Sequence, residues 1–134
     1  MTDQPVETHL GDVIEISVPA SPVYVSLLRT AAAALAARLD FTVDEIDDLR
    51  IAVDEACALL LPDARSDATL ICRLVLDEAA LRVSVTAATK SQQPPGPSSF
   101  AWMVLTALAT DVSVDTSGDH TLTVNLSKAR STSP

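Results

Sequence analysis

The sequence predicts an α+β fold, a two-layer sandwich with three helices on one face of a mixed, mostly antiparallel sheet. Two observations support this prediction. Five short segments have the apolar patterning of strands, and three longer segments repeat apolar side chains at helical spacing. The expected order is βααββαββ, in which paired strands are set apart from the helices. With 134 residues, 48% of them hydrophobic, the chain is long enough for one domain with a core.

A strand and a helix are expected at the start of the domain. Residues 1–12 are polar and are expected to form a flexible N-terminus. Residues 13–18, VIEISV, alternate between apolar and polar side chains, which predicts a half-buried strand. Pro22 suits the first turn of a helix, and the alanine-rich sequence after it favours a helix to about Leu39.

The second helix, over residues 42–61, carries the strongest local signals of the chain. Thr42 and Glu45 have the spacing of a capping box, and Phe41 and Ile46 have the spacing of a hydrophobic staple. Pro62 is expected to end the helix. Apolar residues at helical spacing form one stripe, which predicts that the helix packs on a core. These residues are Ile46, Leu49, Val53, Ala56, Cys57 and Leu60.

Two strands, a loop and a third helix follow. Residues 68–76 and 80–86 are expected to be strands joined by a short turn. Residues 89–99, TKSQQPPGPSS, are rich in proline and serine and predict a loop. The sequence from 99 to 110, SFAWMVLTALAT, predicts a helix with Ser98 or Ser99 as its N-cap.

The chain is expected to close with a hairpin. Residues 111–116 and 121–127 have strand patterning and are separated by a turn that contains Gly118. The domain is therefore expected to span residues 13–128, followed by a polar tail over 129–134.

Composition and cysteine usage restrict the function. The net charge of −9 disfavours direct binding to nucleic acid, whose phosphates need Lys and Arg. It fits either a role in solubility or a basic protein partner. Cys57 and Cys72 have no metal-binding spacing, so we expect buried thiols and no metal site. No apolar run reaches the length of a membrane span, and the expected location is the cytoplasm.

At this length and with this order of elements, the chain resembles the GHKL, or histidine-kinase ATPase-like, fold. More narrowly it resembles the RsbW-type anti-sigma factors, which are serine kinases that regulate bacterial alternative sigma factors. The resemblance covers about residues 13–128. It rests on LRTAAAALAARLDFTVDEIDDLRIAVDEA in the first two helices and ALATDVSVDTSGDHTLTVNLSK at the end. It implies as partners an alternative sigma factor and a STAS-domain anti-anti-sigma factor, and a possible homodimer.

The first nucleotide motif of that family, Glu-x-x-x-Asn, lies on the second helix. The family's Glu is a catalytic base, and its Asn ligates the Mg²⁺ that bridges the nucleotide phosphates. The resemblance places this Glu at Glu55, but the Asn position is Leu59, and an aliphatic side chain cannot bind a hard cation. Glu55 is then either a catalytic base or a vestigial carboxylate beside a partly filled cleft.

The family's other two nucleotide motifs are also changed. Its Asp-x-Gly-x-Gly motif binds adenine through the Asp, and the matching positions here begin at Ala87 and replace a glycine with Thr89. Its glycine pair at the start of the last helix matches Ser99 and Ala101, where Phe100 and Trp102 are expected to crowd the phosphates. The loop before that helix is shorter than the usual ATP lid.

These joint losses predict that the chain binds ATP and Mg²⁺ poorly and needs no cofactor. The expected function is an anti-sigma factor that sequesters its sigma factor until a STAS-type antagonist releases it, without ATP-dependent kinase activity. The alternative is an active kinase that binds Mg·ATP and phosphorylates its antagonist. A third reading is a domain that binds another small molecule in the old cleft.

Three further residues bear on the expected site. The resemblance makes Arg29 a partner-binding residue, with an ordinary surface arginine as the alternative. Asp54 is expected to be solvated. Trp102 is expected to be a core residue or an interface anchor.

Overall fold

The computed structural model describes residues 11–77, 79–91 and 99–131. Its elements follow the predicted order βααββαββ, with a short 3₁₀ turn before α1 and another after α2. Residues 1–10 of the expected flexible N-terminus, 92–98 of the loop and 132–134 of the tail lie outside the described residues. In chain order the elements are β1 (Val13–Pro19), η1 (Pro22–Tyr24), α1 (Val25–Arg38), α2 (Val43–Leu60), η2 (Leu61–Asp63), β2 (Thr69–Leu76), β3 (Ala80–Ala88), α3 (Phe100–Leu108), β4 (Asp111–Ser117) and β5 (Thr121–Ala129).

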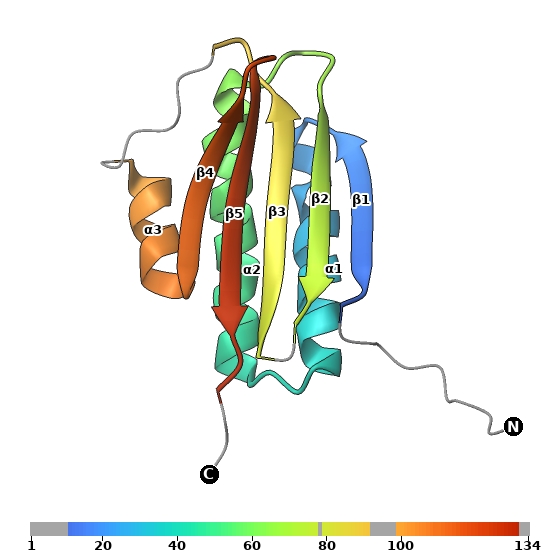
Figure 1. Cartoon of the computed structure of the whole chain (residues 1–134), viewed down its shortest axis with the longest axis vertical. Helices are drawn as coiled ribbons and strands as arrows, with labels where there is room; N and C mark the ends of the chain where they lie inside the picture. The colour runs from blue at the N-terminus through green and yellow to red at the C-terminus, as the bar shows by residue number, and fades with distance from the viewer. Residues whose placement is uncertain (1–10, 78, 92–98, 132–134) are drawn as a thin grey trace, which may run out of the picture.

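Five strands form one sheet in the order β1-β2-β3-β5-β4, with β1 and β4 at its edges (Figure 1). Each of the four pairings between the described strands is antiparallel. The prediction of a mostly antiparallel sheet is confirmed. No parallel pair occurs among these strands, so the sheet is not mixed.

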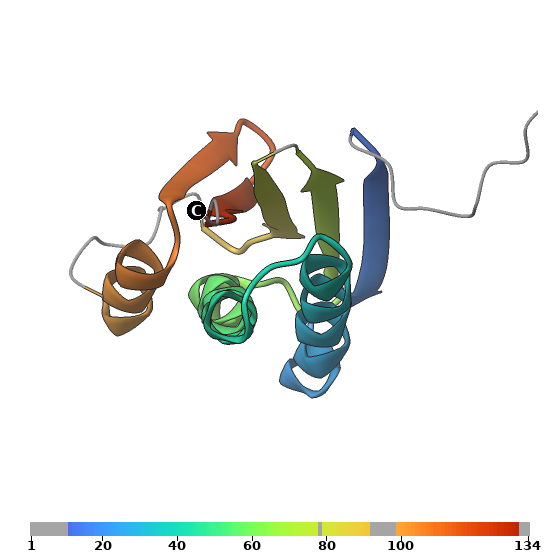
Figure 2. The ribbon, with the colours of Figure 1, turned by 90° about the horizontal axis from the view of Figure 1, so that it is seen from below.

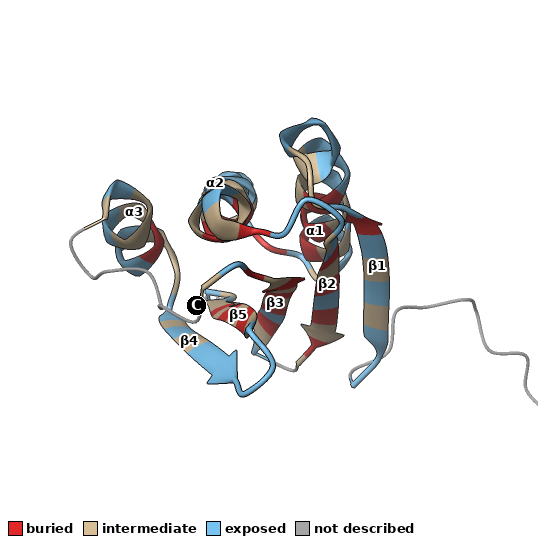
Figure 3. Cartoon of the chain, turned by 90° about the horizontal axis from the view of Figure 1, so that it is seen from above, coloured by how far each residue is buried: buried red, intermediate tan, exposed pale blue. Residues whose placement is uncertain are grey.

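The three helices cover one face of the sheet, as predicted, and the other face is open (Figures 2 and 3). The helix α2 lies between α1 and α3. The core between the layers is almost entirely aliphatic, because every second residue of β2, β3 and β5 is buried against the helices. Its largest fully buried side chains include Leu28, Leu49, Leu60, Leu70, Leu74, Leu81 and Leu105.

The predicted capping box begins α2. The Glu45 amide donates to Thr42 Oγ1 at 3.1 Å, and the Thr42 amide donates to Glu45 Oε1 at 2.7 Å. The apolar stripe is buried along the helix, with Ala52 as an additional member and Ile46 only partly buried. Pro62 lies in the 3₁₀ turn that follows the helix, so its role in ending α2 is confirmed.

The start of the first helix differs from the prediction. Pro22 begins a 3₁₀ turn, in which the Val25 amide donates to the Pro22 carbonyl, and the α-helix begins only at Val25. Proline is compatible with either first turn, because it needs no amide donor there. The sequence therefore located the start of helical structure but not its type.

The end of β5 and the residues after it fasten the helical layer to the sheet. Lys128 Nζ donates to Asp48 Oδ2 on α2 at 3.1 Å and to the Leu108 carbonyl at the end of α3 at 2.7 Å. The Ser131 amide donates to Glu45 Oε2 at 2.7 Å. The first residues of the expected polar tail are thus hydrogen-bonded to the domain.

Glu45 gives the stability of this corner a pH dependence. Desolvation alone would raise the pKa of Glu45, but hydrogen bonds from the amides of Thr42 and Ser131 outweigh it and hold the pKa below its usual 4.5. A carboxylate with a depressed pKa stabilises the fold above its unfolded-state pKa, and this contribution is lost as the pH falls.

We predict that Glu45→Gln lowers the free energy of unfolding by about 0.3–1 kcal/mol at about pH 7. The difference from wild type should vanish in acid, as the pH falls below about 4.5 and the Glu45 carboxylate is protonated. Urea denaturation at several pH values measures both quantities. The control is Asp44→Asn, which removes an exposed charge from the same helical turn. Equal acid sensitivity of wild type and Glu45→Gln would contradict the prediction.

Candidate functional site

Glu55 and Leu59 lie one turn apart on the same side of α2. Successive helical residues are about 100° apart, and Asp54 faces α1, so Glu55 turns toward α3 instead. The Glu55 side chain is half-buried and makes no hydrogen bond or ion pair within the described part of the chain. Leu59 is also half-buried and packs against the core, so this side of α2 presents one carboxylate next to an aliphatic side chain.

The segment that corresponds to the adenine motif ends β3. Ala87 is buried and pairs with Leu122 of β5, so its methyl group is part of the core. Thr89, two residues on, is 1% exposed, and the single proton of its hydroxyl is shared between the carbonyls of Ser91 and His120. Both side chains are therefore part of the folded interior, and neither presents a hydrogen-bond acceptor to an adenine base.

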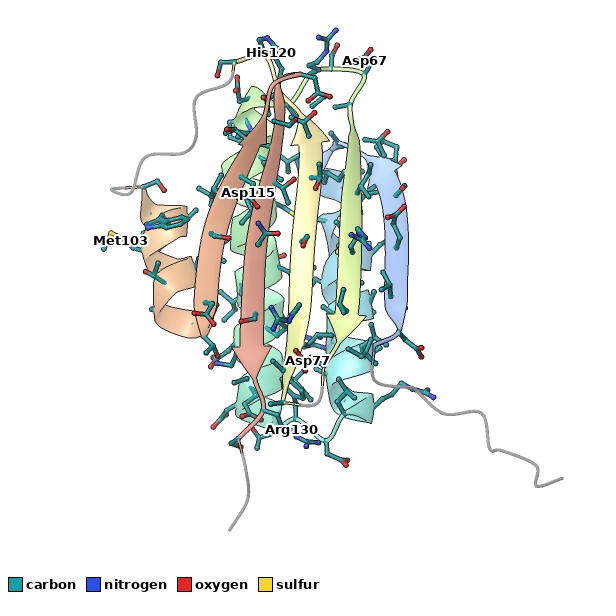
Figure 4. All side chains as sticks on the ribbon, viewed as in Figure 1. Asp67, Asp77, Met103, Asp115, His120 and Arg130 are labelled. Atoms are coloured by element: carbon teal, nitrogen blue, oxygen red, sulfur yellow. The ribbon has the colours of Figure 1, made fainter. Side chains whose placement is uncertain are left out.

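The chain after Thr89 is held to the end of α2. Asp63 Oδ2 accepts from the Ser91 hydroxyl at 2.7 Å and from the Ser91 amide at 3.2 Å. The Asp63 carbonyl accepts from the Lys90 amide at 2.8 Å. Figure 4 shows His120 and Asp67 at this same end of the molecule. We call the four residues Asp63, Thr89, Ser91 and His120 the clasp. No local sequence pattern marked it, because its partners come from three separate segments.

The N-terminus of α3 is capped by a side chain of the same segment. Ser99 is the N-cap, and its hydroxyl accepts from the Trp102 amide at 3.2 Å, which resolves the choice between Ser98 and Ser99. This amide is no longer available to a phosphate group. Phe100 is 74% exposed and so fills no cleft, whereas Trp102 is half-buried, and their crowding of the phosphates stays a prediction.

These positions do not fit Mg·ATP. A magnesium ion needs oxygen ligands in a near-octahedral array, and Leu59 offers none beside Glu55. At the adenine position Ala87 has no hydrogen-bonding side chain, and at Ser99 the cap uses an amide that would bind phosphate. Among the described residues no group of three or more His, Cys, Asp or Glu side chains is placed to hold a metal ion.

Arg29 lies on the other side of α2, in an ion pair with Asp54. Its Nη1 donates to both carboxylate oxygens of Asp54, at 2.9 and 2.8 Å. The side chains are 39% and 35% exposed. The expectation that Asp54 is simply solvated is wrong, because the packing of α1 on α2 brings the guanidinium to it.

The two cysteines are free and buried, as predicted. Burial raises the pKa of Cys57 to about 12 and that of Cys72 to about 11. Thiols with such pKa values stay protonated and unreactive at neutral pH. Their role is therefore in packing, Cys57 on α2 and Cys72 on β2.

The fold and the site together define an α+β domain of the GHKL type whose nucleotide-binding positions have other side chains. A family model described as "Histidine kinase-like ATPase domain" matches residues 18–128. The chain belongs to this family. None of the described helices is both long and apolar enough to cross a membrane.

Two similar proteins with known names are both called RsbW. "Anti-sigma-F factor RsbW" of Mycobacterium tuberculosis strain H37Rv is 43% identical to this chain over 101 residues. These residues cover 74% of this chain and 59% of that relative. "Serine-protein kinase RsbW" of Bacillus subtilis is 52% identical over 47 residues, which cover 35% of this chain and 29% of that relative. The chain thus spans about three fifths of the mycobacterial relative's length.

A solved structure shows the same fold. It is the crystal structure of the RsbU and RsbW domains of Rv1364c from Mycobacterium tuberculosis, with a TM-score of 0.70. The likeness covers 91% of this chain and 34% of that chain, at 15% sequence identity. At this identity the likeness bears on the fold alone.

The clasp gives a prediction about stability. Thr89→Val keeps the shape of the side chain but removes the buried hydroxyl, which leaves the carbonyls of Ser91 and His120 without this donor. We expect a loss of about 1–3 kcal/mol in the free energy of unfolding. Chemical denaturation measures it, and Thr30→Val at an exposed position of α1 is the matched control. Equal free energies of unfolding for the two variants would show that the Thr89 hydroxyl of the clasp adds nothing to stability.

Proposed function

We propose that this protein is an anti-sigma factor that binds and sequesters an alternative sigma factor in the cytoplasm. The bound sigma factor cannot reach the RNA polymerase core. Release follows when a STAS-type anti-anti-sigma protein competes for an overlapping surface. The observation that carries the proposal is the 43% identity over 101 residues to a protein named an anti-sigma-F factor.

The charge of the chain supports a basic partner. The net charge is −9, and the first half of α2 carries the acidic residues Asp44, Glu45, Asp47 and Asp48. Together these charges create a negative electrostatic potential around the protein. This potential attracts a protein with a DNA-binding surface, because such a surface is rich in Lys and Arg. Complementary charge of this kind raises the rate of association and makes it depend on salt.

The altered nucleotide site supports regulation without phosphorylation by this protein. Glu55 is retained, but Leu59 takes the place of the metal ligand, and Ala87 and Thr89 are built into the fold. A general base acts only on a substrate that is positioned next to it. Release of the sigma factor would then depend on the amounts of sigma factor and antagonist. Homodimerisation of this protein stays a prediction.

The alternative is an active serine kinase that phosphorylates its antagonist. Two observations favour it. Glu55 occupies the position of the catalytic base with a half-exposed side chain, and a Bacillus relative named a serine-protein kinase is 52% identical over 47 residues. Under this alternative the protein would bind Mg·ATP with other ligands than those of the family.

Calorimetric titration with Mg·ATP separates the two functions. We expect no saturable heat at micromolar protein and nucleotide, because the site lacks the metal ligand and the adenine acceptor. The Glu55→Ala variant is the control and should give the same flat trace. Micromolar binding that disappears in Glu55→Ala or on addition of a metal chelator would establish the alternative.

Partner binding is tested with purified sigma factors of the source organism, assayed one at a time by biolayer interferometry. We expect one of them to bind, with an affinity that falls as salt rises. Arg29→Glu, which reverses the charge beside Asp54, should weaken this complex about tenfold or more. Arg73→Glu, at an exposed position of β2 on the open face of the sheet, is the control. Unchanged affinity of Arg29→Glu would remove Arg29 from the interface.

A further inference from the structure

We propose that the outer edge of β4 is a docking site for an extended segment of a partner protein, which adds to the sheet as one more strand. The segment that fits carries basic and hydroxyl side chains on one face and apolar side chains on the other. None of the residues of this edge belongs to the nucleotide positions or to the Arg29–Asp54 pair, so the inference does not rest on the proposed function.

The strand β4 is paired on one side only. It forms a regular antiparallel ladder with β5, and no other described strand lies against it. In such a ladder every second residue directs its amide and carbonyl away from the paired strand. An open row of backbone donors and acceptors is a template for a further strand, which then gains hydrogen bonds along its length.

The side chains of β4 on the open face of the sheet define the charge of the segment. Asp111 and Asp115 alternate with Val112 and Val114, which pack partly buried against the core, so both carboxylates lie on the open face and are exposed. Asp115 accepts from Asn125 Nδ2 at 2.8 Å, and neither carboxylate forms an ion pair with a described residue. A strand with Lys or Arg opposite these positions would form cross-strand pairs of opposite charge.

The opposite edge of the sheet presents no such free carboxylate on its open face. On β1 the Glu15 carboxylate already pairs with Arg73 of β2, with 3.5 Å between Oε1 and Nε. A second copy of this chain is also a poor occupant of the β4 edge. An antiparallel β4–β4 pair centred on Ser113 would place Asp111 of each copy opposite Asp115 of the other, and like charges in that position destabilise a strand pair.

The helix α3 extends past the edge of the sheet, above the place of the added strand. Figures 2 and 3 show α3 farther out than β4, which is the last strand on that side. The helix has no charged residue, and Phe100 and Met103 are 74% and 60% exposed. Figure 4 shows Met103 on its outer side. Apolar side chains of an added strand would pack against this helix, and that contact removes apolar surface from water.

A hollow on the open face gives the basic side chains room. Its volume is about 500 Å³, and Asp111, Ser113 and Asp115 line it on the β4 side, with Asn125 of β5 next to them. Long side chains reach diagonal neighbours as well as the residue directly opposite. A lysine on the added strand can therefore contact either carboxylate across the hollow.

A designed peptide tests the docking site. The probe is acetyl-TVKVTVKVT-amide, whose two lysines have the same spacing as Asp111 and Asp115 and whose sequence reads the same in both directions. We expect saturable binding to the full chain, followed by the fluorescence of Trp102 on α3, which is the single tryptophan of the chain. The control peptide, acetyl-KVVTTTVVK-amide, has the same composition and charge without the alternation, and should bind about fivefold more weakly or less. Equal binding of the two peptides would overturn the proposal.

Two charge reversals in the protein separate a local contact from attraction by net charge. Asp115→Lys should weaken binding of the first peptide about fivefold or more, because an attractive cross-strand pair becomes repulsive. Glu15→Lys changes the net charge by the same amount at the opposite edge and should weaken binding by less than about twofold. Similar unfolding temperatures show that both variants fold. Equal weakening by the two variants would overturn the β4 edge as the site.

Hydrogen exchange measures where the peptide binds. Amides at an open edge exchange fast, and a bound strand protects them. With the peptide present, residues 111–117 of β4 should gain protection and residues 13–19 of β1 should not. Protection at β1 instead, or no saturable binding, would overturn the docking site. Neither result bears on the anti-sigma function, because that function is tested by the binding of sigma factors to the wild-type protein.

Discussion

The burial of one stripe of α2 against the sheet is the constraint on which the rest of the structure depends. Leu49, Val53 and Leu60 are fully buried, and they fix the rotation of the helix about its own axis. Once this rotation is fixed, every other residue of α2 has its direction determined by helical geometry. Asp54 must face α1 and Glu55 must face α3. A single packing event thus points the Glu55 carboxylate and the Arg29–Asp54 ion pair in directions about 100° apart around one helix.

The replacements at the nucleotide positions are physically consistent with one another. Leu59 packs on the core, Ala87 lies inside it, and Thr89 closes the clasp with its hydroxyl. Each of these side chains adds a contact to the folded state where a nucleotide-binding residue would instead leave a polar group waiting for its ligand. A buried polar group without its partner is costly, so apolar or internally hydrogen-bonded side chains at these positions stabilise the folded state in the absence of a nucleotide.

The sequence predicted the elements well because their signals are local. The capping box spans only Thr42 to Glu45, and the strands show their period within a few residues. The Arg29–Asp54 pair joins residues 25 apart, and the Thr89–His120 bond joins residues 31 apart. Such contacts follow from how helices and strands pack, which no local pattern encodes.

Under the proposed function, the two sides of α2 would have separate roles. Leu59 lies on the side toward α3, whereas Asp54 pairs with Arg29 on the side toward α1. Binding to a partner through Arg29 would need a fixed helix but no nucleotide. Catalysis needs the same helix together with a metal ligand, an adenine acceptor and free amides at the start of α3. Under the proposed function, catalysis would be lost with any one of these groups, whereas partner binding would depend only on the packing of α1 on α2.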